Sequence, residues 1–167
     1  MLVFSDVISD DRMLSDSFPI REVDDVVYEV DCKLIQPRRG AGIDIGAGPP
    51  AEEAQEELGD GGTNIIDVID AFQLQSIIFD KKSYIAHLKG YLRAIERYLQ
   101  ETDPSRVQEF EKNVNGYVKK ILGNFNNYEF YTGGSMNTDG MVALLNYRED
   151  GVTPFFTFWK NGLRAVH

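Results

Sequence analysis

The chain has 167 residues, a length typical of one domain with its own hydrophobic core, and a net charge of −10. This acidic balance argues against nucleic acid as a partner, because binding phosphate needs a basic surface. Cys32 is the only cysteine, which excludes an intrachain disulfide and a cysteine-based zinc site. The sequence shows neither a signal-peptide pattern nor an apolar run of the roughly 18 residues that a membrane span needs. We therefore expect a cytoplasmic protein without a membrane span.

The amino-terminal part of the chain predicts β-structure. Weak alternation indicates an edge strand at about 2–8, and residues 26–35 alternate more clearly, with a period of two that predicts a half-buried strand. Its apolar face contains Val26, Tyr28, Val30, Cys32 and Leu34, and its opposite face contains Glu29, Asp31 and Lys33. The Cys32 thiol is therefore expected to be buried and structural.

Segment 40–63 interrupts this pattern with seven glycines, two adjacent prolines and six acids, and it contains no Lys or Arg. Such a composition buries little apolar surface, so we predict a long flexible acidic loop. The glycines lack phosphate-loop spacing, and the acids lack the EF-hand order. Weak calcium binding is an alternative to a purely solvated loop, and its ligands would be Asp44, Glu52, Glu53, Glu56, Glu57 and Asp60.

Strand-like sequence resumes over 64–79, and residues 80–122 then change to a helical period. The apolar positions recur at spacings of three and four: Ile85, Leu88, Leu92, Ile95 and Leu99, then Val107, Phe110, Val114, Tyr117 and Ile121. Between the two runs, Asp103 is expected to cap a second helix with Pro104 in its first turn, and Gly123 is expected to end it. We predict two antiparallel helices over 80–123.

The carboxy-terminal part again predicts strands, at 128–133, 140–150 and 153–162, with Asp150-Gly151 as the turn of a hairpin. The fold class is therefore α+β: one domain over 1–167, with an antiparallel β core formed by 1–39, 64–79 and 124–167.

Charge is unevenly distributed between the helical hairpin and the rest of the chain. Residues 80–123 carry nine Lys or Arg and six Asp or Glu, a net charge of +3, whereas the remainder carries eight and twenty-one, a net charge of −13. A basic hairpin on an acidic body can steer acidic partners, although a solvated helix face is the simpler interpretation. The candidate binding residues are Lys81, Lys82, Lys89, Arg93, Arg97, Lys119 and Lys120.

Residues suited to catalysis are few. Ser83 and His87 share a helix face, but this spacing is common, and we expect His87 to be exposed to solvent. The many carboxylates, including Asp10, Asp11, Asp16 and Glu149, form no recognisable catalytic pattern. We therefore predict no enzyme activity and no cofactor beyond weak calcium binding, and the sequence does not identify the residues of a metal site.

Three segments, 5–35, 79–125 and 141–163, closely resemble the translationally controlled tumour protein family, especially its fungal members. They include SDDRMLSD, FDKKSYIAHLKGYL and NYREDGVTPFFTFWKNG. The resemblance implies a β-tent core with a projecting helical hairpin and a flexible acidic loop. It also implies a growth-associated, non-enzymatic binding protein with tubulin or microtubules, calcium, translation elongation factors and a small Rheb-like GTPase as partners.

The chain departs from the family pattern at several positions. Ile45 to Glu52 read IGAGPPAE, so Pro50 replaces a serine that phosphorylation requires. Arg12 and Gly134 replace two acids that the resemblance assigns to GTPase contact, together with Asp11 and Asp16. We therefore favour binding of acidic partners by the basic hairpin, and regulation of a Rheb-like GTPase is the alternative.

Overall fold

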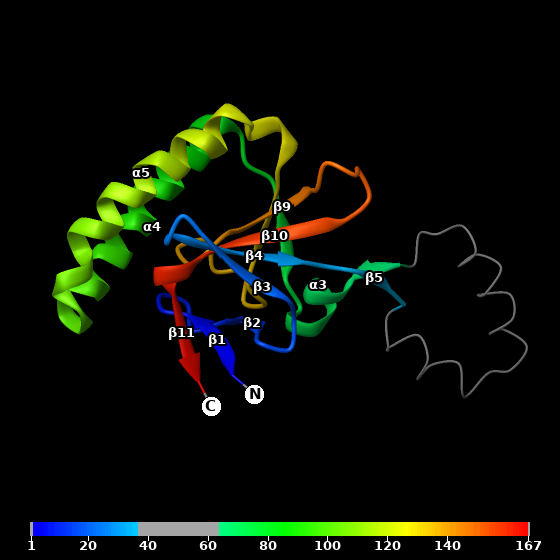
Figure 1. Ribbon diagram of the computed structural model, residues 1–167, viewed down its shortest axis with the longest axis horizontal. Coiled ribbons are helices and arrows are strands. Elements are labelled where there is room, and N and C mark those ends of the chain that lie inside the picture. The colour runs from blue at the N-terminus through cyan, green and yellow to red at the C-terminus, as the bar shows by residue number, and fades with distance from the viewer. Residues whose placement is uncertain (1, 37–63, 167) are drawn as a thin grey trace, which may run out of the picture.

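The computed structural model describes residues 2–36 and 64–166, and it places a helical hairpin against a body of antiparallel strands (Figure 1). The predicted loop at 40–63, with its calcium candidates and Pro50, lies outside the described residues. The strands are β1 Val3–Asp6, β2 Arg12–Ser15, β3 Ile20–Val23, β4 Val27–Asp31, β5 Leu34–Ile35, β6 Ile65–Ile66, β7 Gln75–Ile77, β8 Glu129–Thr132, β9 Ala143–Tyr147, β10 Pro154–Trp159 and β11 Leu163–Val166.

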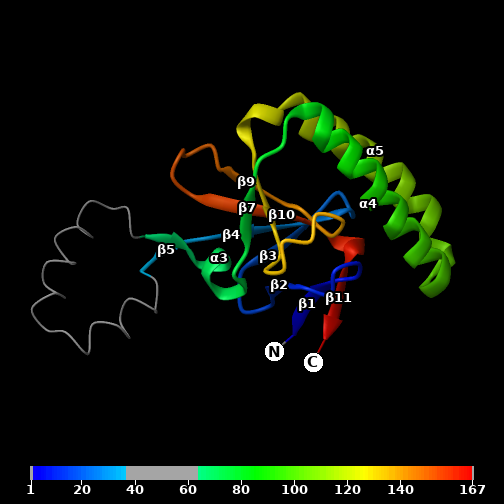
Figure 2. The same ribbon diagram turned by 180° about the vertical axis from the view of Figure 1, so that it is seen from behind.

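The strands form two main sheets and a short ribbon, and every pairing is antiparallel. A six-stranded sheet has the order β3-β4-β10-β9-β8-β7, a three-stranded sheet has the order β11-β1-β2, and β5 pairs with β6. Figure 2 shows the small sheet on one side of the large sheet and the helical hairpin on the other. The predicted α+β class, with an antiparallel β body, is confirmed.

The central strand β10 is buried because both faces of the large sheet are covered. All six of its residues are buried, as expected for a strand between two paired neighbours in a sheet with two covered faces. The Trp159 ring meets Tyr117 of the hairpin at 6.1 Å between centroids. On the opposite face, Tyr28 of β4 approaches Phe4 of β1 at 6.0 Å, which joins the large sheet to the small one.

The helical hairpin contains α4 Lys81–Thr102 and α5 Val107–Gly123, joined by a short 3-10 turn, Pro104–Arg106. Helix α4 starts after Asp80, whose carboxylate accepts a 2.7 Å hydrogen bond from the Ser83 N–H. Both helices lie within the predicted range, and α5 ends at Gly123 as expected. Asp103 is the N-cap residue of the 3-10 turn and Pro104 lies in its first turn, as expected, but the Asp103 carboxylate accepts from the Ser105 hydroxyl and makes no capping bond to a backbone N–H.

The buried surface of α4 includes more than the aliphatic positions predicted from the sequence. Its buried residues are Tyr84, Leu88, Tyr91, Ile95 and Leu99. Two tyrosines are thus fully packed where the aliphatic pattern favoured Ile85 and Leu92, which are only partly buried. The aliphatic period identifies the contact with α5, but α4 also packs against the β body, and its tyrosines fill that second contact.

The strand prediction for 64–79 is wrong in its middle. A short helix, α3 Asp67–Phe72, separates β6 from β7, and it ends at Gln73 with a left-handed φ of 55°. The Asp67 carboxylate accepts from the backbone N–H of Val68 at 2.8 Å and of Lys33 at 3.2 Å, which favours a helical start at this point. The apolar pattern of this short stretch suits a buried helix as well as a strand.

The strand predicted over 26–35 divides into β4 and β5, and two of its residues differ from expectation. Glu29 is buried although it lies on the face predicted to be polar, and Leu34 is 58% exposed although it was assigned to the apolar face. Cys32 is buried as expected, and burial raises the pKa of its thiol to about 12. The predicted turn is confirmed, because Gly151 joins β9 to β10 with a φ of 72°.

Candidate functional site

The basic face of the hairpin follows one strip of α4. Lys82, Lys89, Arg93 and Arg97 recur at steps of seven and four, so they lie above one another on the helix surface, and all four are exposed. Lys81, Lys119 and Lys120 are also exposed, and the Lys120 ammonium lies 5.1 Å from the centre of the Tyr117 ring. Within residues 2–36 and 64–166, none of these seven cations takes part in an ion pair.

Acidic residues lie beside this strip on the side that faces α5. A groove of about 350 Å³ runs between α4 and α5, with Lys89 and Arg93 along one wall and Glu96 and Glu111 beside them. A hydrogen bond that the Glu96 carboxyl shares with Glu111 is the main cause that raises the pKa of Glu96, because the two carboxyl groups lie close together and Glu96 keeps the proton. The positive strip is therefore bounded by negative charge on the side that faces α5.

The distal end of the hairpin is fixed to the body by charged contacts. Asp25, in the turn between β3 and β4, meets Lys160 at 2.5 Å and Arg106 at 3.8 Å. Hydrogen bonding with Glu109, and then with Lys160, lowers the pKa of Asp25 to about 2. Arg106 and Glu109 belong to the hairpin, so their contacts with Asp25 link the hairpin to the β body.

The buried Glu29 carboxylate lies farther along the same face of the sheet. Arg148 donates to it at 2.7 Å and to Asp31 at 2.9 Å, and the guanidinium stacks on Phe155 at 3.7 Å from the ring centre. The Tyr117 hydroxyl approaches Glu29 at 3.5 Å. Arg148 therefore compensates a buried negative charge, and this role is structural.

Asp6 is a fully buried carboxylate that the sequence did not distinguish from its neighbours. It accepts hydrogen bonds from the Ser9 hydroxyl at 2.6 Å, the Met141 N–H at 2.7 Å and the Tyr91 hydroxyl at 3.0 Å. It also accepts from the backbone N–H groups of Ile8 and Ser9. One side chain thus joins β1, helix α4 and the segment that precedes β9.

The residues of the predicted GTPase-binding face are partly brought together. The Ser135 hydroxyl donates to the Asp11 carboxylate at 2.7 Å, so Arg12 and Gly134 lie beside one contact between β2 and the loop after β8. A Cβ at Gly133 would collide with Asp11, whereas one at Gly134 would meet its nearest neighbour at 3.6 Å. Asp16 follows the other end of β2, where it accepts from the Leu2 N–H, so it does not join this corner.

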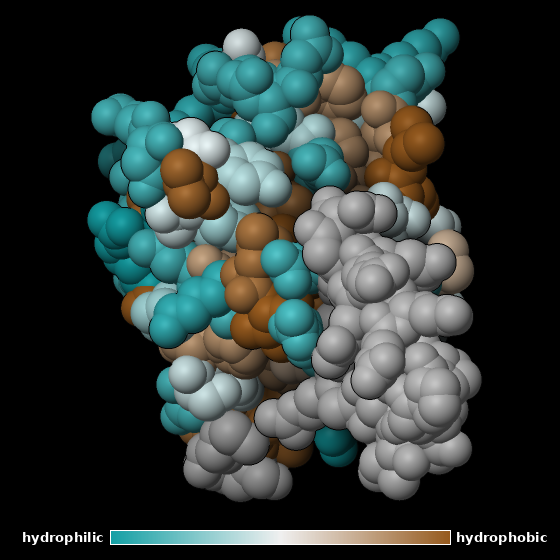
Figure 3. All heavy atoms as spheres, turned by 90° about the vertical axis from the view of Figure 1, so that its right-hand side faces the viewer, coloured by the Kyte–Doolittle hydropathy of each residue, from teal (hydrophilic) through white to brown (hydrophobic). Residues whose placement is uncertain are grey.

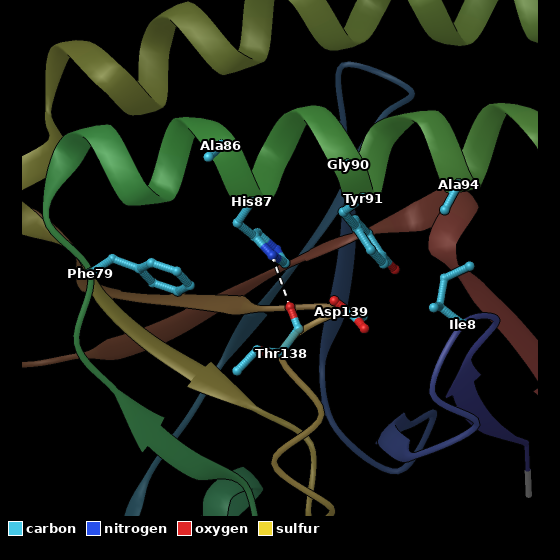
Figure 4. Close-up of a pocket in the computed structure, with 9 residues that line it drawn as sticks. All are labelled: Ile8, Phe79, Ala86, His87, Gly90, Tyr91, Ala94, Thr138 and Asp139. Atoms are coloured by element: carbon cyan, nitrogen blue, oxygen red, sulfur yellow. Dashed lines mark hydrogen bonds between the residues drawn. The ribbon is translucent and has the colours of Figure 1, made fainter.

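A groove of about 410 Å³ lies between α4 and the loops that carry Ile8 and Thr138–Asp139 (Figure 4). Its wall on α4 consists of the small residues Ala86, Gly90 and Ala94 together with His87 and Tyr91. We call this feature the α4 groove.

His87 lines the α4 groove and is half-buried, so the expectation of a solvent-exposed ring is wrong. Its Nδ1 lies 3.1 Å from the Thr138 carbonyl oxygen, and its Nε2 is buried with no hydrogen-bond partner in the described part of the chain. The ring stacks on Tyr91 at 5.8 Å between centroids. Burial lowers the pKa of His87, against smaller raising effects from Thr138, Asp139 and Asp6.

The described residues contain no cluster of three or more His, Cys, Asp or Glu able to hold a metal ion. His87 bonds to Thr138, and no hydrogen bond joins it to Ser83 within the described ranges. No helix among these residues is long and apolar enough to cross a membrane. Where the structure describes the end of the molecule in Figure 3, apolar residues lie in small groups among hydrophilic ones, as on ordinary protein surfaces.

These features define a class of α+β protein in which a helical hairpin with a basic face is held on a β body. A family model described as "Translationally controlled tumour protein" matches residues 1–164, and the chain belongs to this family. It is 50% identical to the "Translationally-controlled tumor protein homolog" of Schizosaccharomyces pombe, over 98% of this chain and 97% of that one. The homolog of Mycosarcoma maydis is 54% identical, over 99% of each chain.

Solved structures show the same fold. The structure of "Translationally Controlled Tumor-associated Protein p23fyp from Schizosaccharomyces pombe" matches with a TM-score of 0.82 and 49% identity, over 100% of this chain and 99% of that one. The NMR structure of the protein from Caenorhabditis elegans matches with a TM-score of 0.71 and 27% identity, over 100% and 98%. The predicted family and its β-tent fold are therefore confirmed.

Proposed function

We propose that this protein is a non-enzymatic, cytoplasmic binding protein whose hairpin face recognises acidic segments of partner proteins. The observation that carries this proposal is the exposed strip Lys82, Lys89, Arg93 and Arg97, which makes no ion pair within the described residues. Because the rest of the chain is strongly acidic, the strip is the main attractive surface for a negative partner. The acidic tails of tubulin are the partner that the family resemblance suggests, and they would place the protein on microtubules.

Co-sedimentation with microtubules tests this proposal. The wild-type protein is compared with a triple variant that changes Lys89, Arg93 and Arg97 to Glu, at low salt and at about 0.2 M salt. We expect binding at low salt that weakens as salt is raised, because the Debye length shortens to less than ~10 Å. The triple variant should bind at least about 10-fold more weakly, since each reversed contact costs on the order of 1 kcal/mol.

A matched control separates local charge from net charge. Arg12, Arg21 and Lys33 are exposed residues of the body, and changing all three to Glu alters the net charge by the same amount. This control should retain most of the binding. The proposal fails if the wild-type protein does not bind at low salt, or if the hairpin variant binds as well as the body variant.

A second candidate function is regulation of a small Rheb-like GTPase by the corner that holds Asp11, Arg12 and Gly134. The hydrogen bond between Asp11 and Ser135, which brings these positions together, supports it. A Cβ at Gly134 would meet no atom closer than 3.6 Å, so this position can take a side chain, and changing Arg12 and Gly134 to Glu would give both positions an acid. We expect this double variant to bind the GTPase more tightly than wild type, and nucleotide release measured with both proteins tests it. No acceleration by either protein would remove this function.

Two further associations rest on the family resemblance and are proposed on that ground. Elongation factors of translation are candidate partners, which a pull-down with wild type and the hairpin variant tests. Weak calcium binding would involve the loop acids at 44–60, and calorimetric titration with calcium measures it directly.

A further inference from the structure

The α4 groove and the basic strip run side by side in register. Ala86, Gly90 and Ala94 of the groove each lie three residues before a base of the strip, namely Lys89, Arg93 and Arg97. Residues three apart are neighbours on a helix surface, so each small residue adjoins one cation. Both rows repeat every four residues, and together they place a row of small residues in the groove next to a line of positive charge. The groove is partly polar, since His87, Thr138 and Asp139 also line it.

The shape of the groove suits a chain segment. Ala86 and Gly90 are exposed, and a Cβ at Gly90 would meet no atom within 4 Å, so another backbone can approach α4 closely. Ile8, 37% exposed, stands across the groove from Ala94 and offers an apolar contact on the other wall (Figure 4). Peptide helices that bind in grooves use apolar side chains repeated at such spacings.

The charged residues around the groove restrict how a bound segment can be oriented. The far rim of the groove carries Asp139, and the flank of the strip beside α5 carries Glu96 and Glu111. Carboxylates of an occupant are therefore attracted only along the central row of Lys89, Arg93 and Arg97. The side chains that point toward the loop at 138–139 must be neutral or basic, because an acid there would face Asp139.

We propose that the α4 groove binds an acidic amphipathic helix of a partner protein, with apolar side chains in the groove and carboxylates every fourth residue on the basic strip. This inference rests on the proposed function, since the strip is the same, and it adds the binding mode and the partner's pattern. A partner segment that is acidic but has no apolar row binds the strip alone, and binds it more weakly.

Two synthetic helical peptides test the inference. Both have Glu at every fourth position, and one has Leu on the adjoining row where the other has Gln. We expect the wild-type protein to bind the Leu peptide at least about 10-fold more tightly than the Gln peptide at about 0.15 M salt, which corresponds to about 1.4 kcal/mol.

Filling the groove should remove this preference without changing charge. In Gly90→Leu the new side chain occupies the groove, and in the matched control, Gly116→Leu, the same change is made on α5 where a Cβ also meets no atom within 4 Å. Gly90→Leu should bind both peptides equally and weakly, and Gly116→Leu should behave like wild type. Amide chemical shifts of Ile8 and Gly90 in the wild-type protein, recorded with the Leu peptide, test the location independently of any variant.

The outcomes distinguish the inference from the function on which it rests. The groove inference is overturned if wild type does not prefer the Leu peptide, if Gly90→Leu keeps the preference, or if the shifts map elsewhere. In each case the proposed function still stands, provided that reversing Lys89, Arg93 and Arg97 weakens binding of both peptides and of microtubules. Failure of that reversal overturns both.

Discussion

Replacing Asp6 by Asn tests the buried contact that joins helix α4 to the β body. The change keeps the shape of the side chain but puts an NH₂ group in place of one acceptor oxygen. In the wild type, one oxygen accepts from the Met141 N–H, the Ser9 N–H and the Ser9 hydroxyl, and the other from Tyr91 and Ile8. Whichever way the amide turns, at least one donor loses its acceptor.

The expected cost follows from these contacts. An orphaned buried donor costs about 1–3 kcal/mol, so orphaning one or two donors should lower the free energy of unfolding by about 1–6 kcal/mol. That is a large part of the ~5–15 kcal/mol that stabilises a typical domain. Urea unfolding at neutral pH, followed by circular dichroism, measures the loss.

Asp10→Asn is the matched control, because the Asp10 side chain is 77% exposed and its ion pair, with Arg164, lies at the surface. It should lose no more than about 1 kcal/mol. A cycle with Tyr91→Phe then measures the coupling between Asp6 and α4. A loss below about 1 kcal/mol for Asp6→Asn, or one equal to that of the control, would refute the reasoning.

Other positions give sharp expectations. Burial lowers the pKa of His87 below ~6.5, so the unfolded chain binds more protons than the folded one just below neutrality, and the free energy of unfolding falls as pH drops from about 7 to 5. The urea midpoint of His87→Phe should depend less on pH than that of the wild type, and an equal dependence would contradict this expectation. Gly133→Ala drives a Cβ into a carboxylate and should cost about 1–3 kcal/mol in thermal melts, whereas Gly134→Ala should cost less than about 0.5, and equal losses argue against the contact. Arg148→Met should cost about 2–4 kcal/mol by leaving Glu29 unpaired, and adding Glu29→Gln should recover part of it; no recovery means that the pair is not the cause.

The periodicity of apolar residues was sufficient to predict secondary structure wherever one pattern extended over many residues. The helices of 80–123 repeat their apolar spacing for several turns, and the exposed bases from Lys82 to Arg97 follow from the same period. The stretch at 67–72, DVIDAF, is too short for this, because four apolar residues interrupted by an aspartate fit a strand or a helix equally well. The Asp67 carboxylate at its start accepts from the Lys33 N–H, a contact with a distant part of the chain that local sequence does not reveal.

The side chains whose burial the sequence did not predict share one cause. Alternation along β4 shows which way Glu29 points, but Arg148 and Tyr117, which bury it, come from distant segments. Asp6 is one of several acids near the amino terminus, and the approach of Met141 and Tyr91 from distant segments distinguishes it as a buried acceptor. In each case a contact between distant segments decides the environment, and a single sequence carries no local signal for it.

One wall of the α4 groove could be predicted from local sequence, and the other could not. The four-residue spacing of its small residues is visible in the printed sequence, next to the bases that the basic strip contains. Its second wall is formed by Ile8 and by the loop at Thr138–Asp139, which the topology of the sheets brings to α4. A helix surface alone therefore suggests the strip, and the fold is required to recognise a groove.

The pairing of β1 with β11 has a consequence for how this chain folds. Val3 lies opposite Val166, so the small sheet is completed by residues from the two extremes of the described chain. Contacts of such high contact order carry a large loop-closure entropy unless the intervening segments are already compact. During synthesis on the ribosome, β1 emerges first and must remain without this partner until residues 163–166 have been made. Until then, the edge of β1 that β11 covers in the folded sheet has backbone N–H and C=O groups without strand partners.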